Sequence, residues 1–148
     1  MDKQNGVVLS VNISEQKGQK KSNIEEVFVK ENWGMESDAH SSDEGHRQIS
    51  LLSLSSVEKM RAMGVAVEFG DFAENITLEG IEVAKLPIGA KLKVGEVTLE
   101  VTQIGKECIN KGCAIKKQVG TCVMPKEGIF ARPLNSGSIK VGDAVEVI

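Results

Sequence analysis

The stretch AKLKVGEVTLEVTQIG, which begins at Ala90, constrains the fold more than any other part of the chain. Leu92 and Val94 alternate with lysines before a turn at Gly95, and apolar residues alternate with polar ones after that turn. A period of two is the signature of β-strands that bury one face. The stretch therefore predicts two strands joined by a tight turn.

Other segments predict further strands and one helix. VVLSVNIS, VFVKENW, ITLEGIEV and the C-terminal GIFARPLNSGSIKVGDAVEVI have the character of strands, with turns at NSG and GD. Ser55 to Glu58 fits a capping box before VEKMRAM, and Gly64 stands where a helix would end. Closure removes the exposed edges of many short strands. We therefore expect a mostly β protein, a closed or nearly closed β-barrel with one or a few short helices.

Length and composition exclude several classes of protein. The 148 residues are the size of one domain, so we expect a single domain over residues 1–148. The net charge of −3 and the lack of a basic, aromatic stripe argue against a nucleic-acid binder. No apolar run approaches the length of a membrane helix, and the N-terminus lacks the pattern of a signal peptide. We expect a cytoplasmic protein that does not bind membranes.

All three cysteines lie in GKECINKGCAIKKQVGTC, at Cys108, Cys113 and Cys122. In the cytosol thiols are kept reduced, and three of them cannot pair off internally, so a disulfide framework is disfavoured. If the preceding strand continues, Lys106 and Cys108 project from the same face, and the ammonium favours the thiolate. A nucleophile, a persulfide carrier and a ligand for a soft metal all require that thiolate. The alternative is that Cys108 is a small buried residue.

Zinc binding by the three cysteines is a weaker hypothesis. Structural zinc ligands usually come as pairs separated by two to four residues, whereas the gaps here are four and eight residues. His40 and His46, in the polar stretch WGMESDAHSSDEGHRQ, could complete such a site, but hydrogen bonding explains them equally well. The two-residue spacing of a thioredoxin-like pair is missing.

Four blocks together resemble the MOSC domain, named for the C-terminal part of molybdenum cofactor sulfurase. They are SDAHSSDEGHRQISLLS, FGDFAENITLEGI, LPIGAKLKVGEVTLEVTQIGKEC and EGIFARPLNSGSIKVGDAVEV, in that order over nearly the whole chain. The likeness is greatest to the small stand-alone members associated with molybdopterin-biosynthesis proteins. It implies a β-barrel in which Cys108 either carries sulfur from a pyridoxal-phosphate-dependent cysteine desulfurase or ligates the molybdenum of a pterin cofactor.

The resemblance also implies the other residues of the site. Arg47 or Lys106 would neutralise the pterin phosphate or polarise a persulfide, and Asn75 is the residue most expected to bond the cofactor. Gly70 and Asp71 could instead make a turn, and Asp71 or Glu74 could cap a backbone donor. The residues implied to line the pocket are Asp38, His40, His46, Arg47, Gln48, Gly70, Asp71, Glu74 and Asn75.

The chain departs from the family pattern at two positions. Ser37 stands where a glycine usually precedes the first Asp-x-His, and Ile109 stands where a histidine often follows the key cysteine. The first change bears on a turn that favours a left-handed backbone, and the second removes a proton relay beside Cys108. Cys113 and Cys122 are secondary sulfur sites, resolving thiols or buried packing.

Three functions remain open on this basis. The first is a sulfur-carrier or molybdenum-cofactor-binding domain that works with a cysteine desulfurase or with molybdenum cofactor biosynthesis proteins. The second is a molybdenum-dependent reductase of N-hydroxylated compounds, with electrons from a partner because no flavin or iron–sulfur motif is visible. The third is a non-catalytic metal- or partner-binding barrel. Pyridoxal phosphate is expected on the partner desulfurase, since nothing here marks a Schiff-base lysine.

Overall fold

The computed structural model describes residues 5–13, 22–36, 49–64, 68–69, 74–104 and 128–148. These residues form mainly strands, with one α-helix, α1 (Leu54–Ala62), and one turn of 3-10 helix, η1 (Val83–Lys85). The strands are β1 (Asn5–Ile13), β2 (Ser22–Ile24), β3 (Glu26–Lys30), β4 (Gly34–Met35), β5 (Ile49–Ser53), β6 (Ile76–Glu79), β7 (Lys91–Val94), β8 (Val97–Ile104), β9 (Ile129–Pro133), β10 (Gly137–Lys140) and β11 (Ala144–Val147).

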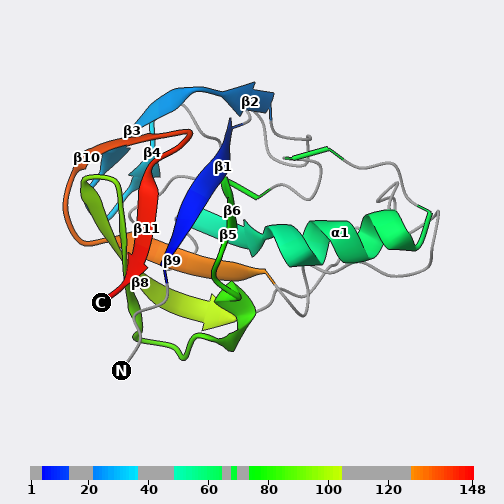
Figure 1. Ribbon diagram of the computed structural model, residues 1–148. Helices are drawn as coiled ribbons and strands as arrows, with labels where there is room; N and C mark the ends of the chain where they lie inside the picture. Colours follow the sequence, from blue (N-terminus) through cyan, green and yellow to red (C-terminus); the bar gives the residue numbers. More distant parts are fainter. Residues whose placement is uncertain (1–4, 14–21, 37–48, 65–67, 70–73, 105–127) are drawn as a thin grey trace, which may run out of the picture.

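Seven of the strands close into a barrel, which confirms the predicted fold (Figure 1). Their order is β11-β7-β8-β9-β5-β6-β1, and β1 pairs with β11 to complete the ring. Strand β1 can do this because its first residues pair with β11 while its last residues pair with β2. The hairpin predicted around Gly95 is present, with Leu92 opposite Leu99.

Strand β2 extends the barrel sheet beside β1, and the other three strands form a small sheet in the order β10-β3-β4. Alternate residues of β3 and β10 are buried, namely Val27, Val29 and Ile139, and they belong to the same cluster as the barrel interior. That cluster consists of aliphatic side chains and Met35. A core of this composition is consistent with the 3% aromatic content of the chain.

The predicted helix exists, but the predicted capping box is wrong. Helix α1 begins at Leu54 after Ser53, whose side chain makes no capping bond because its hydroxyl donates to the Ile81 carbonyl over 2.7 Å. Ser55 already lies inside the helix and bonds Glu82 instead. Gly64 does follow the helix with a φ of 91°, as expected for a left-handed terminal residue. No helix among the described residues has both the length and the apolar character needed to cross a membrane.

Helix α1 connects β5 to β6, which pair in parallel, with Leu51 opposite Ile76. The other pairings among the described strands are antiparallel. A parallel pair needs a crossover connection, which explains why the helix lies at this point of the chain. The starts of β5 and β6 therefore lie at the same end of the barrel.

Two glycines, Gly6 in β1 and Gly80 after β6, allow these two strands to approach closely. A Cβ on Gly80 would lie 2.5 Å from the Asn5 carbonyl oxygen and 2.8 Å from the Gly6 Cα. Gly80 also has a φ of 92°, in the region that disfavours side chains. Gly142 has the same φ, but nothing lies within 4 Å of the Cβ that it would carry.

We expect Gly80→Ala to destabilise the protein more than Gly142→Ala. Both substitutions strain a left-handed backbone, at about 1–2 kcal/mol, whereas only the first also forces Cβ against the backbone of β1, at about 1–3 kcal/mol more. Urea unfolding of the two variants and the wild type measures this difference. Equal losses would show that the contact between β1 and the end of β6 is not tight.

Candidate functional site

Two of the residues predicted to form the site are described by the structure, Glu74 and Asn75. Both are buried and lie directly before β6, with Asn75 only 1% exposed. The other predicted residues lie outside the described residues, and the structure says nothing of their positions. They are Asp38, His40, His46, Arg47, Gln48, Gly70, Asp71, Lys106, Cys108, Cys113 and Cys122.

Asn75 is bonded to the strands on both sides through its backbone and through its side chain. On the β5 side, its N–H donates to the Ser50 carbonyl over 2.9 Å, and its Oδ1 accepts the Ser50 N–H over 2.9 Å. On the β1 side, its carbonyl accepts the Asn12 N–H over 2.7 Å, and its Nδ2 donates to the Asn12 carbonyl over 3.1 Å. We call these four bonds the Asn75 bracket.

The bracket gives Asn75 a structural role. The side-chain amide takes the place of a peptide group between β5 and β1, and the Ser50 hydroxyl also donates to its Oδ1 over 3.2 Å. Both polar atoms of this amide are therefore occupied by the protein itself. The expectation that Asn75 bonds a cofactor stays a prediction, but the structure already explains why an asparagine stands here.

A cluster of buried polar side chains surrounds the bracket. The Thr77 hydroxyl donates to Oε2 of the fully buried Glu74 over 2.8 Å, and Asn12 Nδ2 donates to the Glu74 carbonyl over 3.1 Å. Burying polar groups is costly unless they are bonded, so these residues act as one network. Its members, called here the polar cluster, are Ser10, Asn12, Ser50, Glu74, Asn75 and Thr77.

Sequence reasoning missed most of this cluster. Asn12 stands in the strand sequence SVNIS, where a polar residue between apolar ones indicates a solvent-facing position. In the structure Asn12 is fully buried. Three of its partners, Glu74, Asn75 and Thr77, lie 62, 63 and 65 residues away in sequence, so the local pattern could not identify it.

The polar cluster lies at the end of the barrel where two of the predicted blocks attach. Residues 37–48 lead into the start of β5, and residues 70–73 lead into Glu74. Since β5 and β6 are parallel and joined by the Asn75 bracket, these two attachment points are adjacent.

The segment that carries Cys108 attaches differently. Residues 105–127 connect Ile104 at the end of β8 to Ile129 at the start of β9, and these two residues are paired. Strand β9 is antiparallel to β5, and its first residue, Ile129, lies opposite Leu51 in the middle of β5. The described strands therefore place the starts of β5 and β6 side by side, and the cysteine segment returns opposite Leu51, the residue after Ser50.

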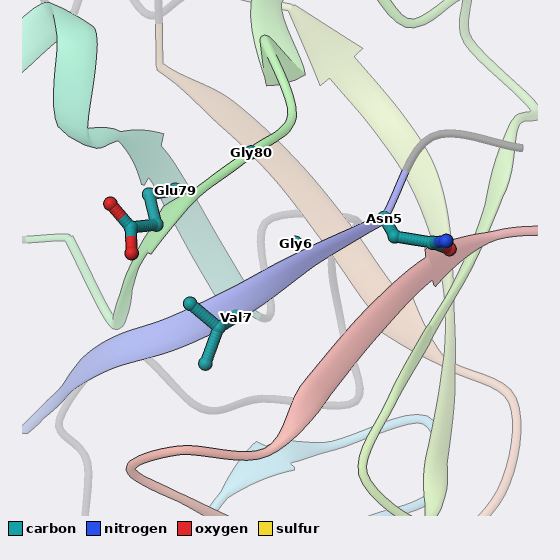
Figure 2. Close-up of a pocket in the computed structure, with 5 residues that line it drawn as sticks. All are labelled: Asn5, Gly6, Val7, Glu79 and Gly80. Atoms are coloured by element: carbon teal, nitrogen blue, oxygen red, sulfur yellow. The ribbon is translucent and has the colours of Figure 1, made fainter.

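A shallow, open depression of about 370 Å³ lies near the other end of β6 (Figure 2). Its lining residues are Asn5, Gly6, Val7, Glu79 and Gly80, none of which belongs to the predicted site. Glu79 supplies its one charged side chain. Within the described part of the chain, no three or more histidine, cysteine, aspartate or glutamate side chains are grouped so as to hold a metal ion.

The closed seven-stranded barrel with a crossover helix places the chain in the class of small β-barrel domains. A family model of the MOSC domain matches residues 36–146, so the chain belongs to the MOSC domain family. MOSC domains are related in general to the molybdenum cofactor. A search of curated proteins finds no significant match.

Solved structures share the fold at low sequence identity. The YuaD protein from Bacillus subtilis has a TM-score of 0.83 and 16% identity, with 99% of this chain and 97% of that chain covered. YiiM from Geobacillus stearothermophilus has a TM-score of 0.71 and 21% identity, with 97% and 75% covered. YiiM from Escherichia coli has a TM-score of 0.64 and 16% identity, with 100% and 70% covered. At these identities the comparisons show the fold alone.

We expect Asn75→Ala to destabilise the protein by about 2–4 kcal/mol, because it leaves the buried Ser50 N–H and Asn12 carbonyl without partners. Asn135→Ala is a matched control. Asn135 also bridges two backbone groups, accepting from the Thr98 N–H and donating to the Glu96 carbonyl, but it is only half-buried, in a turn that water can reach. The control should lose about 1 kcal/mol or less. Chemical denaturation compares the two, and a loss at Asn75 no larger than at Asn135 would contradict the structural role of the bracket.

Proposed function

We propose that this chain is a sulfur-carrying or molybdenum-cofactor-binding domain that acts in molybdenum cofactor metabolism through the thiolate of Cys108. The observation that carries the proposal is the MOSC match over residues 36–146, which includes the GKEC sequence ending at Cys108. The site of action is the cytoplasm, where thiols are kept reduced.

The chemistry of Cys108 depends on its thiolate. If the strand continues through residue 108, Lys106 and Cys108 project from the same face, and the ammonium would favour the thiolate. In sulfur transfer, this thiolate attacks the outer sulfur of a persulfide on a cysteine desulfurase. One sulfur–sulfur bond forms on Cys108 as the other breaks, and the donor cysteine leaves as a thiolate. No external oxidant or reductant is needed, and pyridoxal phosphate stays on the desulfurase.

The side chains of Cys108, His46, Arg47 and Gln48 are also suited to binding a molybdenum cofactor. A thiolate is a soft ligand that can bind the metal, and Arg47 with His46 and Gln48 would supply donors for an anionic pterin phosphate. When bound, the cofactor would supply a redox-active metal. Of the two predicted residues that the structure describes, Asn75 has its amide committed to the bracket. We therefore propose that Asn75 supports the site and that neighbouring residues supply most of the donors to the cofactor.

Replacement of Cys108 tests the proposal. We expect Cys108→Ser to abolish sulfur loading and cofactor binding while it keeps the unfolding midpoint, because serine is nearly the same size but forms no thiolate at neutral pH. Native mass spectrometry with elemental analysis is performed after incubation with a cysteine desulfurase and cysteine, and separately after co-expression with molybdenum cofactor biosynthesis proteins. A reductant-sensitive gain of about one sulfur atom supports the carrier. Molybdenum with a pterin mass supports a cofactor-binding domain.

Cys113→Ser and Cys122→Ser are the matched controls, and each should keep most of the loading. Equal loss at all three positions, accompanied by release of zinc, would replace the proposal with a structural metal site. Loading that persists in Cys108→Ser would also overturn it. A molybdenum-loaded protein that reduces N-hydroxylated compounds when an electron donor is supplied would establish the reductase alternative.

A further inference from the structure

The outer face of the small sheet β10-β3-β4 (Figure 1) carries exposed aromatic side chains. Alternation along β3 turns Val27 and Val29 towards the core and leaves Phe28 on the outer face, 45% exposed. Trp33, in the turn between β3 and β4, is 37% exposed. The sequence holds four phenylalanines and one tryptophan, so two of these five aromatic residues are exposed at one small sheet. Because aromatic side chains are enriched at protein–protein interfaces, this placement indicates a contact surface.

Strand pairing places Phe28 at the centre of this face. On one side, Ser138 of β10 lies opposite Phe28. On the other side, Met35 of β4 pairs with Val29, and both are buried. The next residue, Glu36, is exposed, and its N–H donates to the Phe28 carbonyl over 3.0 Å. Phe28 therefore stands on the outer face between Ser138 and Glu36.

Opposite charges stand at equal distances from Phe28 along β3. Glu26 precedes Phe28 by two residues and Lys30 follows it by two, so all three project from the same face, each charge about 7 Å from Phe28 along the strand. Both charged residues are exposed. Lys30 Nζ lies 5.8 Å from the centroid of the Trp33 ring, which places that ring at the Lys30 end of the face. The order along the face is therefore acidic, aromatic and basic.

We propose that this face binds the same face of a second copy of the chain in a two-fold dimer. A two-fold axis that runs across the strands at Phe28 brings β3 of one protomer over β3 of its partner, in the opposite direction. Phe28 then contacts Phe28 of the partner subunit, and Glu26 of each protomer faces Lys30 of the other. Such self-complementary contacts are what a two-fold interface requires. The dimer does not depend on the molybdenum or sulfur chemistry of the chain.

The size of the face predicts a weak dimer. Three strands about 4.8 Å apart and about five residues long present a surface of roughly 15 by 17 Å. Interfaces of this size belong with weak and transient complexes, which bury less than about 1,200 Å² in total. The same two-fold axis brings Glu36 near its own copy at the rim, where salt screens the repulsion. We therefore expect a monomer–dimer equilibrium that depends on protein concentration.

Sedimentation equilibrium from micromolar to millimolar protein measures this association in the full chain. Phe28→Ser removes the central contact, and Ile88→Ser is its matched control, because Ile88 is 66% exposed in the loop before β7. Glu26→Lys and Lys30→Glu each place like charges opposite one another in the dimer. The double variant that carries both reversals restores opposite charges with the signs exchanged. Thermal unfolding at low concentration checks that each variant is folded.

We expect Phe28→Ser to weaken dimerisation about tenfold or more and Ile88→Ser to leave it unchanged. Each single charge reversal should weaken it about three- to tenfold, and the double variant should regain most of the wild-type affinity. A wild type that stays monomeric at millimolar concentration would refute the dimer. Association that Phe28→Ser does not weaken would also refute it, because another surface would then be responsible. A double variant that associates no better than the single reversals would refute the antiparallel arrangement of the two β3 strands.

Discussion

The junction of β1, β5 and β6 depends on the four hydrogen bonds of Asn75. This junction contains the parallel pair of the described barrel, whose strand pairing begins at Leu51 and Ile76, directly after Ser50 and Asn75. Without the bracket, the Ser50 N–H and the Asn12 carbonyl would be buried without partners. A buried donor or acceptor that lacks a hydrogen-bond partner destabilises the fold by as much free energy as a good core contact stabilises it. The end of the barrel that adjoins two of the predicted functional blocks is therefore held by one side-chain amide.

The polar cluster explains how an aliphatic barrel can support a functional end. A buried network stabilises a unique arrangement only when its members are satisfied. Asn12 meets this condition by joining Ser10, Glu74, Thr77 and Asn23. Through Asn23 the network extends outward to an exposed strand and reaches the Phe69 carbonyl. The same bonds that satisfy the interior thus also hold the carbonyls of Phe69 and Glu74.

The sequence predicts the strands of this fold that have one buried face and one face in contact with solvent. The alternation around Gly95 predicted β7, β8 and their turn, and the spacing of strands predicted closure. Strand β5 was not predicted because all five of its residues are buried, so its sequence ISLLS has no period of two. The capping box failed for a tertiary reason, since Ser53 and Ser55 bond the segment that follows β6 instead of the helix backbone.

The sequence could name candidate residues of the site, but it could not show how the strands arrange them. The family resemblance pointed to Asn75, but its role depends on Ser50 and Asn12, which are 25 and 63 residues away in sequence. Strand direction adds a constraint that no motif contains. The starts of β5 and of β6 are joined by the bracket, and the cysteine segment leaves from Ile104 and returns at Ile129, opposite Leu51 in the middle of β5. The strand pairings fix the points at which the two segments join the barrel, although those points are far apart in the sequence.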